Sequence, residues 1–219
     1  FKTLFTDEKH LREVVAETRS RLKVRLMSAG HQAAVSYSMA GLTLDGWYND
    51  YSMGIGYYDY LVMLDENFDS EKEKLIKGCD ELVKAMLKKK KLLISCTCDE
   101  NDYGLLCGAI SEFDSELENF EKENSADILE LESYKPDVKY RKTACSTPAE
   151  VQYAAVSGSY KDVPDVNDGA MMVVKHLLSY GYLWNEVRVK GGAYGVMCRF
   201  SRAGSGSFVS YRDPNLSAT

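Results

Sequence analysis

The chain has 219 residues, of which 45% are hydrophobic and 27% are charged, and its formal net charge is −6. This composition is typical of a globular protein and excludes a disordered or fibrous chain. The mild acidic surplus argues against a nucleic-acid-binding surface, which needs a basic face. Because the chain has no run of about 18 apolar residues, we expect neither nucleic acid nor a membrane among its partners.

The N-terminal sequence FKTLFTDEKHLREV lacks the basic-then-apolar order of a signal peptide. No two cysteines form a C-x-x-C pair, and we expect all six to be reduced and packed as small hydrophobic residues. They are Cys79, Cys96, Cys98, Cys107, Cys145 and Cys198. These features favour a bacterial cytoplasmic protein, with an organelle as the alternative.

The first part of the chain has the pattern of successive helices. Apolar residues recur at helical spacing from Asp7 to Leu26, and Thr6 is the expected N-cap. After a break at residues 28–30, the small-residue stretch His31–Ala40 predicts a tightly packed helix. The tyrosine-rich stretch Trp47–Leu64 predicts one further helix with an aromatic face.

The pattern then changes from helix to strand and back to helix. Ser70 and Glu73 have the spacing of a capping box, which predicts that a helix starts at Ser70. Alternation over Leu92–Cys98 predicts a strand, and helical spacing returns over Asn101–Phe120.

Polar and charged residues around Pro136 mark a connection between two parts of the chain. We therefore divide the chain into a mostly helical part, 1–124, a linker, 125–139, and a strand-rich part, 140–219. The second part is expected to contain two strands, a helix and a closing hairpin. These are Tyr140–Ala144, Val151–Ser157, a helix over Asp165–Val187 with Ala170, Val173, Val174, Leu177 and Leu178 on its buried side, and the strands Ala193–Phe200 and Ser207–Tyr211. The predicted fold class is α+β, with an antiparallel sheet packed against helices.

A zinc peptidase needs two histidines and a carboxylate at fixed spacing on one helix. The three histidines, His10, His31 and His176, lie far apart in the sequence. We therefore expect no metal ligand, no cofactor and no catalytic residue within this chain alone.

The segment from Leu183 to Gly195 is the most unusual part of the sequence. A predicted helix ends with Arg188, two glycines allow a sharp turn, and Tyr194 opens the next strand. Arginine and tyrosine are suitable donors to a peptide carbonyl or a developing oxyanion. The same residues also fit a helix C-cap with an arginine that compensates the helix dipole, followed by a buried aromatic residue. The residue types alone leave both interpretations open.

Several segments resemble the C-terminal half of the pitrilysin superfamily, which includes insulin-degrading enzyme, and in particular its presequence-protease branch. The specific segments are Asn185–Gly195 and Ser210–Leu216. Supporting ones are Thr3–Glu8, the Gly30–His31 junction and Ser146–Tyr153. The resemblance implies a pitrilysin-like or mitochondrial-processing-peptidase-like α/β module. It also implies that 1–124 is the back part of a third module and that 140–219 is the front part of a fourth.

In that family two halves enclose a chamber, and only the N-terminal half carries the zinc motif. The resemblance implies that Arg188 and Tyr194 reach across to the substrate near the zinc, while Gly191 and Gly192 shape the turn between them. The expected function is a fragment of the inactive, substrate-binding half of a zinc metalloendopeptidase that degrades peptides. The expected partners are the zinc-bearing half, peptide substrates and a second copy of the fragment as a homodimer. The alternative is a purely structural module, like the core subunits of respiratory complexes.

Overall fold

The computed structural model describes residues 7–87, 93–123, 142–148, 150–161, 163–164, 166–202 and 204–215. The described residues fall into two compact units, the first containing 7–12, 67–87 and 93–123 and the second containing 13–66 and the described residues between 142 and 215. Helix α1 (Glu8–Ser28) contributes residues up to Arg12 to the first unit and its remainder to the second.

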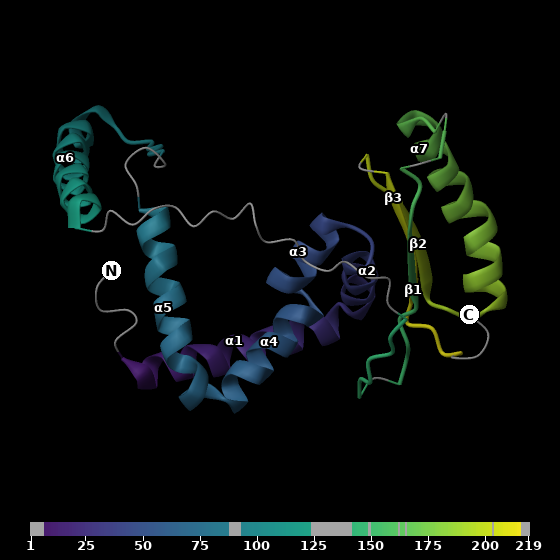
Figure 1. Ribbon diagram of the computed structural model, residues 1–219. Coiled ribbons are helices and arrows are strands. Elements are labelled where there is room, and N and C mark those ends of the chain that lie inside the picture. The colour runs from purple at the N-terminus through teal and green to yellow at the C-terminus, as the bar shows by residue number, and fades with distance from the viewer. Residues whose placement is uncertain are drawn as a thin grey trace. The chain divides into compact units, whose positions relative to one another are not determined.

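The first unit contains the start of α1 together with helices α5 (Phe68–Met86) and α6 (Glu100–Glu123) (Figure 1). Helix α6 begins beside the carboxylate of Asp99. This carboxylate accepts hydrogen bonds from the backbone N–H groups of Asn101 and Asp102, both at 3.0 Å. Such a cap satisfies two of the N–H groups that a helix start leaves without intrahelical partners.

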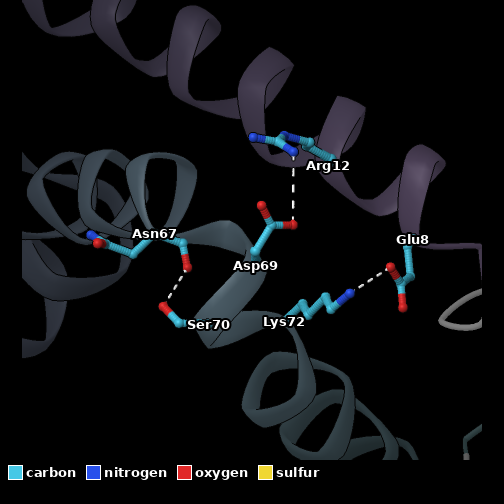
Figure 2. A network of polar contacts seen from close by, with 6 residues as sticks. All are labelled: Glu8, Arg12, Asn67, Asp69, Ser70 and Lys72. Atoms are coloured by element: carbon cyan, nitrogen blue, oxygen red, sulfur yellow. Dashed lines mark hydrogen bonds and ion pairs between the residues drawn. The ribbon is translucent and has the colours of Figure 1, made fainter.

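The predicted capping box at Ser70 is wrong, because α5 begins two residues earlier. Asn67 is the N-cap residue, and its carbonyl oxygen accepts the backbone N–H of Ser70 at 3.1 Å. The Ser70 hydroxyl also donates to this carbonyl, at 2.9 Å (Figure 2). Ser70 therefore lies inside the first turn, where its side chain bonds back to the chain instead of capping the helix.

Two ion pairs join the start of α1 to the start of α5 (Figure 2). Lys72 Nζ lies 2.7 Å from a carboxylate oxygen of Glu8, and an Arg12 guanidinium nitrogen lies 3.9 Å from Asp69. The Arg12 guanidinium also lies over the Phe68 ring, 5.4 Å from its centroid. Because three of these four charged side chains are more than half exposed, we expect the pairs to fix orientation more than to add stability.

The second unit starts with a helical layer. After α1, the chain forms α2 (Gly30–Ala40), α3 (Leu44–Met53) and α4 (Ile55–Glu66). The predicted break at residues 28–30 and the helices on both sides of it are confirmed. Asp7 caps α1, because its carboxylate accepts a hydrogen bond from the backbone N–H of His10 at 3.0 Å. Thr6, the predicted cap, lies outside the described residues.

The single helix predicted over Trp47–Leu64 is wrong, because Gly54 separates α3 from α4. The buried carboxylate of Asp50 accepts the backbone N–H groups of Ile55 at 3.0 Å and Gly56 at 3.1 Å. A Cβ atom at Gly54 would lie 2.2 Å from this carboxylate. Asp50 thus caps α4 from within α3, and the corner requires glycine at position 54.

The second unit also contains an antiparallel sheet of three strands in the order β1–β3–β2 (Figure 1). The strands are β1 (Ala155–Ser159), β2 (Gly195–Phe200) and β3 (Ser205–Tyr211). In the register, Ser157 pairs with Ser207, and Arg199 pairs with the same residue from the other side. The predicted closing hairpin is therefore confirmed, and β3 is the central strand.

Helices cover both faces of this sheet, with α2 on one side and α7 (Asp168–Leu177) on the other (Figure 1). On the α2 face, the hydroxyl groups of Ser38 and Ser157 are hydrogen-bonded. On the α7 face, the Cys198 thiol lies 3.5 Å from the Lys175 carbonyl oxygen and 3.3 Å from the Ser179 hydroxyl. Small side chains at these contacts allow the helices to approach the sheet closely.

Four other predictions fail on the described residues. Of the strands predicted over Leu92–Cys98 and Tyr140–Ala144, residues 93–98 and 142–144 form no strand, and the remaining residues lie outside the described part of the chain. The predicted buried side of the second-part helix is largely exposed: Val173 by 59% and Leu177 by 67%. The α7 region is apolar on more than one face, so periodicity does not identify the side that meets the sheet. Of the six cysteines only Cys198 is buried, and four are exposed.

The predicted α+β class is confirmed by the helices and the small antiparallel sheet. The packing of α2 on β1 and β3 joins segments from the two predicted parts of the chain. Their assignment to two partial modules, with a linker at 125–139, stays a prediction. The homodimer also stays a prediction.

Candidate functional site

The helix predicted over Asp165–Val187 ends in two wide turns. Helix α7 continues into the π-helical segments η3 (Leu178–Tyr182) and η4 (Trp184–Lys190). Within them the backbone N–H of Leu183 donates to the carbonyl of Leu178, five residues earlier. Short π-helical turns are rare and occur frequently at functional sites.

Gly191 and Gly192 end the helix in a glycine cap. Gly192 has a φ of 82°, in the left-handed region, and its N–H donates to the Arg188 carbonyl at 3.1 Å. This is the bond of an αL-type C-cap. Gly191 is required for a different reason, since a Cβ atom there would lie 2.6 Å from the Val187 carbonyl oxygen. Both predicted turn-shaping glycines thus lie in a turn that side chains would strain.

The residues that follow β3 hold this turn from the other side. The Asn215 side chain donates from Nδ2 to the Gly191 carbonyl at 2.8 Å. Its own backbone N–H donates to the carboxylate of the buried Asp213 at 2.9 Å. Asp213 in turn exchanges two backbone hydrogen bonds with Gln152. The glycine turn is therefore anchored to the end of the sheet.

This turn brings Arg188 and Tyr194 together. The Arg188 Cζ atom lies 5.8 Å from the centroid of the Tyr194 ring and 4.1 Å from that of Trp184. The backbone N–H of Tyr194 donates to the Arg212 carbonyl at 3.4 Å, which ties the residue to the end of β3. The Tyr194 side chain is 67% exposed. The C-cap interpretation is therefore correct for the turn, whereas its buried aromatic residue is wrong.

The two cations at this helix end have different environments. Lys190 Nζ lies 2.7 Å from the Glu186 carboxylate, and this hydrogen bond raises the pKa of Lys190. Among the described residues, no carboxylate forms a salt bridge with Arg188 and no acceptor takes a hydrogen bond from its guanidinium. In the described part of the chain, the neighbours of this guanidinium are the Trp184 ring and the exposed Tyr194 ring.

An aromatic cluster extends from Tyr194 into the α2 face of the sheet. Tyr211 contacts Tyr194 edge-on, with ring centroids 6.0 Å apart, and contacts His31 of α2 in the same way at 4.8 Å. Tyr153 completes the cluster, 5.8 Å from Tyr211. The His31 Nδ1 atom is buried there without a hydrogen-bond partner. Burial, and secondarily the positive charge of Arg199 on β2, lower the pKa of His31 from 6.5.

The described residues contain no group of three histidine, cysteine or acidic side chains that could hold a metal ion. A search of the same residues found no helix that is long and apolar enough to span a bilayer.

Sequence reasoning missed two residues of this site. Trp184 lies four positions before Arg188, a spacing that places both on one helical face and was available as a signal. Asn215 lies 24 positions after Gly191, and no local pattern predicts a bond between them.

Comparisons with known proteins identify the family of the chain. A family model described as the PreP C-terminal domain matches residues 142–219, and one for a domain associated with subfamily C of the M16 peptidases matches residues 1–64. The chain belongs to the presequence-protease-like family of M16 peptidases. The predicted family is thus confirmed, and the matched C-terminal model includes Arg188, Tyr194 and the glycine turn.

Relatives in this family come from bacteria, plants and fungi. Protein HypA of Clostridium perfringens is 30% identical over 97% of this chain, and presequence protease 1 of Arabidopsis thaliana, named as chloroplastic and mitochondrial, is 29% identical over 98%. The mitochondrial presequence protease of Gibberella zeae is 28% identical over 87%. The chain spans 21%, 19% and 19% of their lengths, about a fifth in each case. These names indicate no single compartment.

We predict that Gly191→Ala destabilises the second unit by about 2 kcal/mol, because the new methyl group must push the Val187 carbonyl away. Gly195→Ala is the matched control, since its Cβ atom would lie 3.7 Å from the nearest atom, an ordinary contact. Urea denaturation followed by tryptophan fluorescence measures both. Equal midpoints for the two variants would show that the turn tolerates a side chain.

We also predict that the protein loses stability as the pH falls below 6.5. Because the folded-state pKa of His31 is lowered from 6.5, the unfolded chain binds the proton more readily. The contribution of His31 is thus present above pH 6.5 and is lost as the pH falls towards the folded-state pKa. Urea midpoints between pH 8 and pH 5 should fall less steeply in His31→Phe than in the exposed control His10→Gln. Parallel pH profiles would contradict this assignment.

Proposed function

We propose that this chain belongs to the substrate-binding half of a zinc metalloendopeptidase that degrades peptides. The observation that carries the proposal is the pairing of Arg188 and Tyr194 at an exposed helix-to-strand turn. The guanidinium has no acceptor among the described residues, and the phenol is largely exposed. Both groups are suitable hydrogen-bond donors to a peptide carbonyl oxygen.

Within this proposal the chain binds and orients the peptide and does not hydrolyse it alone. The zinc and the carboxylate that activates water belong to the N-terminal half of the protein, which is the chain's partner. Arg188 and Tyr194 donate to the carbonyl oxygen of the bond to be cleaved, on which negative charge develops during attack. Donors fixed in advance stabilise this charge without reorganising during the reaction.

Family membership and the geometry of the turn together support this role. The C-terminal part of the chain matches the PreP C-terminal family model, and two relatives of the chain are named presequence proteases. We also propose that this is a bacterial protein with a cytoplasmic location. The match to a relative from Clostridium perfringens supports the bacterial source.

We predict that Arg188→Ala slows cleavage of a quenched fluorescent peptide by about a hundredfold, as expected when an oxyanion donor is lost. The assay uses the protein at its natural length, or this chain mixed with a separately expressed zinc-bearing half. Lys190→Ala is the matched control, because this cation lies two positions away and is already paired with Glu186.

In the proposed role, only the Arg188 variant is slow, at equal protein stability and equal assembly of the two halves. If Arg188→Ala and Lys190→Ala cleave as fast as the unchanged protein, Arg188 is a helix-terminal cation. The chain would then have the structural role of a core-subunit-like module.

A further inference from the structure

Trp184 lies directly beneath the guanidinium of Arg188. The Arg188 Cζ atom is 4.1 Å from the centroid of the indole ring, well inside the range of about 6 Å for a cation–π contact. Both residues belong to η4, and Trp184 is its first residue. The Trp184 side chain is 39% exposed, so it is neither a core residue nor a fully solvated one.

This contact restricts a side chain that would otherwise be flexible. An arginine side chain has several rotatable bonds, and fixing them on ligand binding costs conformational entropy. A guanidinium already stacked on an indole has lost much of that freedom before the ligand arrives. Tyr194 lies near the same guanidinium, at 5.8 Å, but as an exposed residue it restrains the arginine less.

Among the described residues, the groups that restrain the Arg188 side chain are aromatic rings and not carboxylates. The adjacent carboxylate, Glu186, is engaged by Lys190 at 2.7 Å. A carboxylate on Arg188 would hold it equally well but would occupy its N–H donors. A ring contacts the face of the guanidinium and leaves the donors in its plane free. The arrangement thus fixes Arg188 without neutralising it.

We infer that Trp184 is the positioning residue of Arg188, holding its guanidinium ready for the carbonyl oxygen of a peptide. The inference rests on the proposed function of Arg188 as a peptide-binding donor. It adds that an aromatic ring at position 184 is required for that function, although Trp184 itself donates nothing to the substrate.

The test compares Trp184→Leu and Trp184→Phe in the protein at its natural length, with peptide cleavage as the readout. Leucine removes the aromatic face, and we expect kcat/KM to fall about tenfold, in the range of a partly desolvated cation–π contact. Phenylalanine keeps the face, and its kcat/KM should stay within about threefold of the unchanged protein. Equal losses in the two variants would overturn the inference.

The same substitutions in the Arg188→Ala background separate positioning from a general structural effect. If Trp184 acts through Arg188, Trp184→Leu costs nothing further once Arg188 is gone. A tenfold loss that persists in this background would overturn the inference. If Arg188→Ala itself has no effect, the proposed function fails, and the inference with it. If only Trp184→Leu has no effect, the inference fails alone.

A spectroscopic measurement tests the contact without any assay of activity. The chain has two tryptophans, so Trp47→Phe leaves Trp184 as the only source of indole fluorescence. In that background Arg188→Ala should shift the emission of Trp184, whereas Lys190→Ala should not. An identical spectrum with and without Arg188 would show that the stack is absent in solution and would overturn the inference.

Discussion

The candidate site depends on the pairing of strand β3 with both of its neighbours. Within the described sheet, β3 is the strand that pairs on both edges, and helices lie against both faces. Its buried serines, Ser205, Ser207 and Ser210, are small enough for this double cover. The chain leaves β3 through Asp213 and Asn215, and Asn215 binds the glycine turn. The position of Arg188 and Tyr194 therefore follows from the way β3 ends.

The environment of the Arg188 charge depends on the Glu186 carboxylate, which at this helix end is paired with Lys190. Arg188 is instead held by the faces of Trp184 and Tyr194. Rings stabilise the charge and leave hydrogen-bond donors available, which is what a site for a neutral carbonyl oxygen needs.

Local patterns in the sequence predicted the features that local interactions determine. Helical spacing located α1 and α6, alternation located the β2–β3 hairpin, and the motif around Arg188 identified both the family and the turn. Features set by distant contacts were not predictable. Asp50 breaks a helix by capping the next one, and Asn215 binds a carbonyl 24 positions away. The apolar spacing of α7 predicted the wrong buried side of the helix. Contact with the sheet decides which side is buried, and the local sequence does not show this contact.

A double-mutant cycle tests the central claim, that Arg188 and Tyr194 act on one peptide oxygen. The value of kcat/KM for one peptide would be measured for the unchanged protein, Arg188→Ala, Tyr194→Phe and the double variant, at natural length. Two donors to the same atom are coupled, so the double variant should lose less than the sum of the single losses, by at least about 0.5 kcal/mol. Losses that add within about 0.3 kcal/mol would contradict the account, because they would place the two side chains at independent sites.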